Sequence, residues 1–252
     1  MQARLIAASP QKDHELAQAI LSKCRQPRAS GDLYCVWLTM LGKSSLMIGI
    51  FGGTFDPIHY GHLRPAQEAM QQLALAELRF IPAAIPPHRP PPQASAAQRL
   101  AMVELAIRDL PGLRVDGREL QRGGLSYTVL TLESLRAELG STSLCLLIGA
   151  DQFRSFETWH RWQEIPDLAH LVVLNRPGAT TGALPAWARG RASSDLQALR
   201  AAPAGRLVFL SVSPQDISAS RIRAALVRGG SVQGLLPEVV LDYIRVNQVY
   251  GN

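Results

Sequence analysis

Two histidines stand three residues apart, shortly after a glycine-containing turn. The turn is Gly52-Gly53-Thr54-Phe55, and the histidines are His59 and His62. Residues three apart share one side of a helix, so a helix beginning at Gly61 would direct both imidazoles toward its N-terminus. The free backbone N–H groups and the positive dipole end of that terminus favour an anion. Because imidazoles can donate hydrogen bonds to phosphoryl oxygens, the pattern predicts contact with a phosphate.

A zinc site is a weaker interpretation of this histidine pair. Zinc needs further ligands, and a metalloprotease helix carries a glutamate between its two histidines. Here Tyr60 and Gly61 lie between them, so no acid stands there. We therefore expect no metal held by protein side chains. Packing in the core stays an alternative for either histidine taken alone.

A second candidate anion site lies near the C-terminus, at Ile217 to Arg223. Ser218 is placed to cap a helix, which leaves backbone N–H groups and hydroxyls facing outward. Arg221 and Arg223 are two apart and therefore diverge, so only one of them can easily point at the same ligand. A merely capped amphipathic helix explains this stretch equally well.

Short apolar runs separated by helical patterns must position these residues. The runs have strand length and lie at 46–51, 78–81, 113–115, 143–148, 170–174 and 207–212. Apolar strands alternating with helices predict an α/β fold with a doubly wound, mostly parallel, Rossmann-like sheet covered on both faces. Ligands of such sheets bind in the loops after the strands. The glycine turn and the run Gly149-Ala150-Asp151 both follow a predicted strand.

Helical periodicity and capping residues locate the covering helices. We expect helices over 61–76 and 95–109, one capped by Ser126 and ended by Gly140, and two in a small C-terminal helical part, capped by Ser218 and opened by Pro237. The proline-rich segment 82–92 is predicted to be an extended loop, since proline can neither continue a helix nor pair in a central strand. Segment 180–206 is predicted to be a long excursion with one short helix at 195–200.

The composition limits the classes of partner. Of the 252 residues 47% are hydrophobic and 18% charged, which indicates a buried core. The net charge of +6 suits anionic small molecules, and Lys/Arg clusters with interleaved aromatic residues are missing, so we expect no nucleic-acid partner. No apolar run reaches transmembrane length, so we expect no membrane partner. Three scattered cysteines, Cys24, Cys35 and Cys145, fit a reducing compartment and predict a cytoplasmic protein.

Residues 1–46 differ in pattern from the rest of the chain. They combine a short helical pattern at 13–23, a polar stretch and an apolar run at 33–41. Met47 directly precedes the first predicted strand, close to where a nucleotide-binding domain normally begins. We therefore divide the chain into an N-terminal extension, 1–46, and one domain, 47–252. Our hypothesis is that Met47 is the natural start; a genuine amphipathic extension is the alternative.

Several motifs together resemble a known family. The run at 52–62, with Ile-Ser-Ala-Ser-x-x-Arg at 217–223, resembles the nucleotidyltransferases of the His-x-Gly-His superfamily. Further motifs narrow the resemblance to the bacterial nicotinate-nucleotide adenylyltransferases over residues 47–250. One departure is Ser220, where the family usually has threonine; a hydroxyl is kept, so we expect little consequence. The further motifs are Pro86-Pro87-His88-Arg89, Ser126-Tyr127-Thr128, Ile148-Gly149-Ala150-Asp151 and Thr158-Trp159-His160.

The resemblance implies transfer of the adenylyl group of ATP to nicotinate mononucleotide, which gives deamido-NAD and pyrophosphate in NAD biosynthesis. It implies Mg²⁺ bound with ATP, and His59, His62 and Arg223 as catalytic residues. The residues implied to bind ATP are Gly52, Gly53, Thr54, Phe55, His59, His62, Gly149, Asp151, Ile217, Ser218 and Arg223. Those implied to bind nicotinate mononucleotide are His88, Arg89, Tyr127, Thr128 and Trp159.

The residue types agree with this reaction. The attacking phosphate is already ionised, so the enzyme needs no strong base and must position two anions in line and neutralise charge. The face of Trp159 suits a pyridinium ring, and backbone amides around Tyr127 and Thr128 prefer a carboxylate to a carboxamide, which favours nicotinate over nicotinamide. Without the resemblance, Trp159 could equally be an aromatic residue of the core, and Tyr127 and Thr128 could be the first turn of a capped helix.

Other functions stay open as alternatives. A different adenylyl- or cytidylyltransferase, such as one acting on phosphopantetheine, would not need the Ser-Tyr-Thr and Thr-Trp elements. A non-catalytic nucleotide sensor would bind ATP without turnover, and an RNA-binding module would use the basic excess. A serine hydrolase is disfavoured because the sequence has no Gly-x-Ser-x-Gly elbow. The sequence does not specify the oligomeric state.

Overall fold

A computed structural model of the protein describes residues 46–87, 90–175 and 183–251. The predicted extension, apart from its last residue, lies outside the described residues, as do His88, Arg89 and the first part of the 180–206 excursion. No helix in the described ranges is long and apolar enough to cross a membrane.

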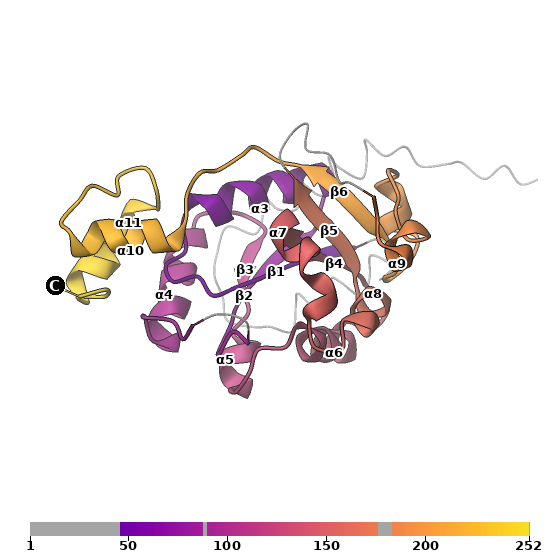
Figure 1. The fold of residues 1–252 in the computed structure, drawn as a ribbon, viewed down its shortest axis with the longest axis horizontal. Helices are drawn as coiled ribbons and strands as arrows, with labels where there is room; N and C mark the ends of the chain where they lie inside the picture. Colours follow the sequence, from indigo (N-terminus) through magenta and orange to yellow (C-terminus); the bar gives the residue numbers. More distant parts are fainter. Residues whose placement is uncertain (1–45, 88–89, 176–182, 252) are drawn as a thin grey trace, which may run out of the picture. The chain divides into compact units, whose positions relative to one another are not determined.

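Six parallel strands form one sheet in the order β3-β2-β1-β4-β5-β6 (Figure 1). Each strand coincides with one of the predicted apolar runs, and the predicted parallel sheet is confirmed. The order reverses between β1 and β4, which places a crevice at their carboxyl ends. The strands are β1 Met47–Gly53, β2 Glu77–Pro82, β3 Leu113–Val115, β4 Ser143–Gly149, β5 His170–Asn175 and β6 Leu207–Ser211.

Helices cover both faces of the sheet. The α-helices are α3 Tyr60–Leu73, α4 Ala96–Ile107, α5 Arg118–Arg122, α6 Thr128–Leu139, α7 Ala150–Arg154, α8 Ile165–Leu168, α9 Ala186–Arg189, α10 Ala219–Val227 and α11 Glu238–Val246. Three short 3-10 helices, η1 Phe156–Thr158, η2 Trp162–Glu164 and η3 Gln197–Leu199, lie in the connections. The C-terminal helices α10 and α11 lie together near α4 (Figure 1).

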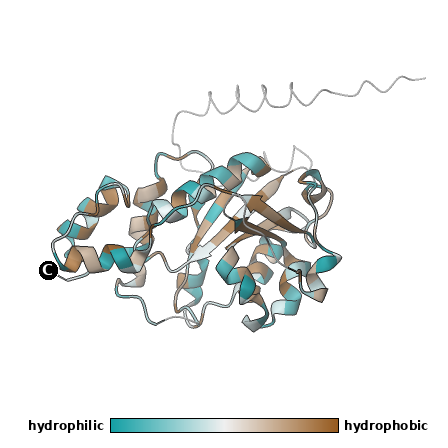
Figure 2. Ribbon diagram, turned by 45° about the horizontal axis from the view of Figure 1, so that its top comes forward, coloured by the Kyte–Doolittle hydropathy of each residue, from teal (hydrophilic) through white to brown (hydrophobic). Residues whose placement is uncertain are grey.

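Alternate side chains of β1 enter two separate hydrophobic cores. Met47 and Phe51 pack in the core that holds the buried residues of α3, α4, α10 and α11. Ile48 and Ile50 pack in the other, with α6 and α8. Burying one large aliphatic side chain in such a core stabilises the fold by about 1.5–3 kcal/mol. Figure 2 shows hydrophobic strands between helices that carry both hydrophobic and hydrophilic residues.

Three local predictions differ from the structure. Helix α3 begins at Tyr60, one residue before the predicted start, with His59 as its N-cap. Ser126 does not cap α6: the N-cap is Tyr127, and the Ser126 hydroxyl instead accepts a hydrogen bond from the Ala84 N–H at 2.8 Å. The helix predicted at 195–200 is only the single 3-10 turn η3, while α5 and α9 were not predicted.

Candidate active site

Two cavities open side by side at the carboxyl ends of β1 and β4, where the strand order reverses. One, which we call the histidine cavity, has a volume of about 570 Å³ and is lined by His59 and His62 among others. The other, the tryptophan cavity, has a volume of about 370 Å³ and is lined by Trp159. Ligands held in the two cavities would meet at the residues that line both, which are Gly52, Gly53, Thr54, Asp151 and Gln152.

Every residue predicted to bind ATP lines the histidine cavity. The end of β1 and the turn after it, the start of α3, the junction of β4 with α7 and the start of α10 each contribute to it. The structure thus brings together two motifs more than 150 residues apart in the chain. The lining residues among those predicted are Gly52, Gly53, Thr54, Phe55, His59, His62, Gly149, Asp151, Ile217, Ser218 and Arg223.

The two histidines face the same side of α3, as their spacing predicts. Their rings stack with centroids 3.8 Å apart and planes 24° apart. Phe55 supports His62 from the side, with ring centroids 5.1 Å apart at 87°. The Phe55 side chain is 1% exposed and its φ is +50°. The residue is buried as a whole, and its ring packs against that of His62.

His59 is buried, and its burial favours the neutral imidazole. Its side chain is 4% exposed, and burial lowers its pKa from the ordinary 6.5 to about 4. Within the described part of the chain its Nδ1 atom has no hydrogen-bond partner. A buried polar atom left without a partner is costly, so such an atom in a cavity wall is typical of a ligand site.

Gly61 allows the start of α3 and the segment before α10 to approach each other closely. A β-carbon on residue 61 would lie 2.8 Å from His59 Nδ1 and 3.1 Å from the Ile217 carbonyl oxygen. The Tyr60 N–H also donates to the Leu235 carbonyl at 2.9 Å. Only glycine fits here without displacing a histidine or the second motif.

Ser218 and Arg223 complete the histidine cavity from α10. Ser218 caps the helix as predicted, its hydroxyl accepting from the Arg221 N–H at 3.4 Å. The predicted divergence of the two arginines is confirmed. Arg223 lines the cavity, whereas Arg221 is exposed and pairs with Asp216 at 2.9 Å.

Asp56 holds the glycine turn in place, a role that the sequence did not reveal. Its carboxylate is buried and accepts hydrogen bonds from the N–H groups of Gln93 and Ala94 at 2.9 and 3.0 Å. The fully buried Arg99 acts on the same turn and donates to the Thr54 carbonyl at 2.8 Å. These contacts tie the turn to the end of the proline-rich loop and to α4. No single motif signals them, because the partners lie about 40 residues away.

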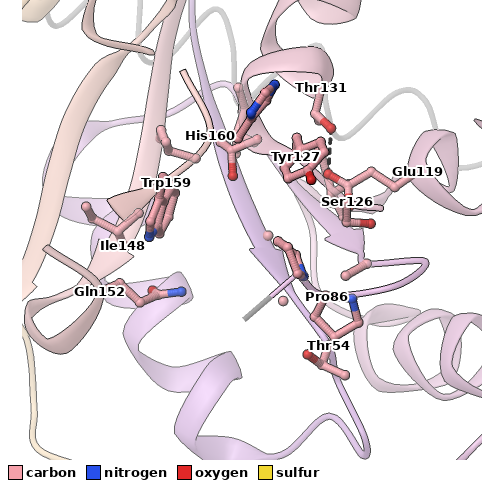
Figure 3. A pocket seen from close by; sticks show the side chains of 18 of the residues that line it. Thr54, Pro86, Glu119, Ser126, Tyr127, Thr131, Ile148, Gln152, Trp159 and His160 are labelled. Atoms are coloured by element: carbon pink, nitrogen blue, oxygen red, sulfur yellow. Dashed lines mark hydrogen bonds between the residues drawn. The ribbon is translucent and has the colours of Figure 1, made fainter. Parts of the chain in front are cut away.

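The tryptophan cavity lies between the β4–β5 connection and the start of α6. Figure 3 shows Trp159 and Gln152 on one side and Tyr127 and Ser126 on the other. His160 also lines this cavity, although we did not predict it as a binding residue, and its ring lies tilted against that of Tyr127, with centroids 4.3 Å apart and planes 34° apart. The structure brings together Tyr127, Thr128 and Trp159, as expected.

The backbone amides at the start of α6 are not all free for a ligand. The Tyr127 N–H donates to the Leu125 carbonyl at 3.1 Å. The N–H groups of Thr128 and Val129 lie in the first turn of α6, where a helix offers donors that have no partner within the helix, whereas the Leu130 N–H already donates to the Tyr127 carbonyl at 3.1 Å. The predicted amide site therefore begins at Thr128 rather than at Tyr127.

A buried polar pair lines the tryptophan cavity near α6. Thr131 donates its hydroxyl to Glu119 at 2.5 Å, and Arg122 approaches the same hydroxyl oxygen at 3.3 Å. These contacts join α5 to α6 (Figure 3). The pair was not predicted because α5 lacks a strong periodic pattern and a side-chain cap.

Comparisons with known proteins agree with this architecture. A family model described as cytidylyltransferase-like matches residues 50–225. A relative from Pseudomonas aeruginosa (strain UCBPP-PA14), named "Probable nicotinate-nucleotide adenylyltransferase", is 50% identical over 207 residues, which cover 81% of this chain and 96% of the relative. A relative of the same name from Halorhodospira halophila is 51% identical over 208 residues, covering 81% of this chain and 95% of the relative.

Solved structures share the fold. The nicotinic acid mononucleotide adenylyltransferase of Plasmodium falciparum, complexed with NaAD, superimposes with a TM-score of 0.61 at 15% identity, covering 81% of this chain and 97% of that one. The two sequence relatives are about half identical to this chain, and the match covers almost their whole length. The chain therefore belongs to the nicotinate-nucleotide adenylyltransferases, within the cytidylyltransferase-like family.

Proposed function

We propose that this protein transfers the adenylyl group of ATP to nicotinate mononucleotide, giving deamido-NAD and pyrophosphate in NAD biosynthesis. The junction of the two cavities at Gly52, Gly53 and Thr54 carries this proposal. One cavity offers imidazole, guanidinium and helix N-terminal donors, which suit a polyphosphate. The other offers an indole face and helix amides, which suit a flat ring with an anionic substituent.

The reaction then needs positioning rather than proton transfer. A phosphate oxygen of the acceptor attacks the α-phosphorus of ATP, a new P–O bond forms, and the bond to the β-phosphate oxygen breaks. The electron pair of that bond leaves with pyrophosphate. His59, His62 and Arg223 stabilise the charge that shifts onto the α-phosphate and the leaving group, and the N-terminus of α10 at Ser218 adds its dipole.

We place Mg²⁺ on the phosphate oxygens of ATP, where it would neutralise part of their charge. Within the described ranges no group of three or more His, Cys, Asp or Glu side chains could hold a metal by itself. The carboxylate of Asp56 is already engaged by two backbone N–H groups. We assign Asp151, which lines both cavities, to the ATP ribose hydroxyls instead.

The acceptor's ring would lie against Trp159, with its carboxylate at the first turn of α6. Both oxygens of a carboxylate accept hydrogen bonds from backbone N–H donors. A carboxamide has only one acceptor oxygen, and its NH₂ group would face those donors unfavourably. His88 and Arg89 would close over the acceptor phosphate from the proline-rich loop.

We place the enzyme in the cytoplasm and keep residues 47–252 as the catalytic domain.

Product analysis tests this function. Purified protein with ATP, Mg²⁺ and nicotinate mononucleotide should form deamido-NAD and pyrophosphate in equal amounts, as mass spectrometry and a pyrophosphate assay would show. Formation of ADP and inorganic phosphate, or no consumption of ATP, would contradict it.

A further inference from the structure

Tyr250, near the C-terminus, contacts Asp56, which directly follows the glycine turn. The Tyr250 hydroxyl donates a hydrogen bond to the Asp56 carboxylate at 2.9 Å, across 194 positions of sequence. Its ring is 9% exposed and belongs to the core beside α3 and α4. Burial, and then the Asp56 charge, raise the pKa of the Tyr250 hydroxyl, so it stays a hydrogen-bond donor.

The backbone is bent to make this contact. Gln248 has a φ of +49° and Tyr250 a φ of +73°, both in the left-handed region that non-glycine residues avoid. Such strained positions persist only where the surrounding structure holds them, and they are common at functional sites. Here they direct the Tyr250 ring inward.

Asp56 connects Tyr250 to Arg223. Arg223 Nη1 donates to the Asp56 backbone carbonyl at 2.6 Å and lies 3.6 Å from Asp56 Oδ2. Tyr250 and Ala94 donate to Oδ1 and Gln93 donates to Oδ2, so these three contacts together fix the rotation of the carboxylate, whose Oδ2 lies on the side of the guanidinium. A fixed carboxylate holds one end of the guanidinium of Arg223, a residue that lines the histidine cavity.

We propose that Tyr250 is a positioning residue for Arg223, acting through Asp56. The proposal rests on the proposed function, in which Arg223 stabilises the phosphates of ATP. Tyr250 itself contacts no substrate. Removing its hydroxyl takes away one of the three hydrogen bonds that orient the carboxylate, which should loosen Arg223 from the geometry that the reaction needs, while the ring still fills the core.

A double-mutant cycle tests the proposal on the full-length enzyme. Tyr250→Phe should lower kcat about tenfold in the otherwise unchanged protein, the cost of one hydrogen bond to a charged group. In an Arg223→Ala background the same change should lower kcat less than twofold, because the group being positioned is gone. Tyr243→Phe is the matched control, since its hydroxyl has no hydrogen-bond partner in the described part of the chain; it should leave kcat unchanged.

The outcomes separate the proposal from the function it rests on. Arg221→Ala is the control for the loss of an arginine on α10. If Arg223→Ala leaves kcat as unchanged as this control does, the assigned role of Arg223 is wrong. If Arg223→Ala lowers kcat but Tyr250→Phe has no effect, or lowers kcat by the same factor in both backgrounds, Tyr250 is only structural and the proposal is overturned. Should Tyr250→Phe unfold at the assay temperature, the same cycle run at a lower temperature at which all the variants are folded gives the decision, with the same non-additivity expected.

Discussion

The imidazole rings of His59 and His62 stack with their centroids 3.8 Å apart. Two imidazole rings so close cannot both be in the positively charged imidazolium form without strong repulsion, unless an anion lies against them. Burial adds to this by lowering the pKa of His59 to about 4. In the free protein at least one imidazole is therefore neutral, and a bound polyphosphate would favour the protonated form. The pair is suited to respond to the charge of its ligand.

Replacing His62 by alanine should separate catalysis from binding. We expect turnover to fall by about 10²–10³, the usual effect of removing one donor that acts on transition-state charge. The ATP dissociation constant should change by less than about threefold, since the glycine turn and α10 remain. Steady-state kinetics and calorimetric titration with ATP measure the two effects. His62→Asn keeps a hydrogen-bond donor and should lose less; unchanged turnover in both variants would refute the assigned role.

Two glycine variants should fail for different reasons. In Gly61→Ala the new methyl group would lie 2.8 Å from His59 Nδ1, so we expect a lower melting temperature together with a lower kcat. In Gly52→Ala no described atom lies within 4 Å of the new methyl group, so the melting temperature should be unchanged. Because Gly52 lines both cavities, its methyl group should instead raise the KM for ATP. Equal melting temperatures and kinetics for the two variants would contradict the geometry.

The pKa of His59 predicts a pH-dependent stability. Between pH 6.5 and about 4 the unfolded chain binds a proton at this residue that the folded protein excludes. The free energy of unfolding should therefore fall with decreasing pH in this window, by up to about 3 kcal/mol. His59→Asn removes the titration, so the stability advantage of the natural protein over the variant should shrink between pH 7.5 and pH 4.5. Urea unfolding at both pH values measures it, and a pH-independent difference would count against a buried, neutral His59.

Trp159 and Trp162 offer a matched pair for the acceptor cavity. Both pack against Phe156, but only Trp159 lines the tryptophan cavity. Trp159→Phe should raise the KM for nicotinate mononucleotide about tenfold, because a phenyl ring covers less of a pyridinium than an indole does. The KM for ATP should stay the same. Trp162→Phe should change neither KM; if it raised the acceptor KM equally, the effect would come from disturbed packing.

The strands and the histidine cavity could be predicted because their signals are local. Continuous apolar runs give the parallel strands, and in a parallel sheet the loops after β1 and β4 must meet at one edge. The spacing of His59 and His62 sufficed to place both rings together. Ser218 was predicted as a cap from its residue type and the helical pattern after it, and the structure agrees.

The rest depends on contacts between distant residues. The hydrogen bond between Asp56 and Tyr250 joins the two ends of the domain and leaves no trace in either local pattern. Ser126 has the right residue type for a cap, yet Ala84 engages its hydroxyl, so tertiary contact overrides local preference. The short helices α5 and α9 have neither periodicity nor side-chain caps, which is why they were not predicted.

The choice of acceptor tests the central claim most directly. With saturating ATP and Mg²⁺, kcat/KM should be measured for nicotinate mononucleotide and for nicotinamide mononucleotide, which differ only in carboxylate against carboxamide. If the first turn of α6 receives the carboxylate, kcat/KM should favour the nicotinate form by about 10²-fold or more. Equal values for the two acceptors would contradict the assigned acceptor site.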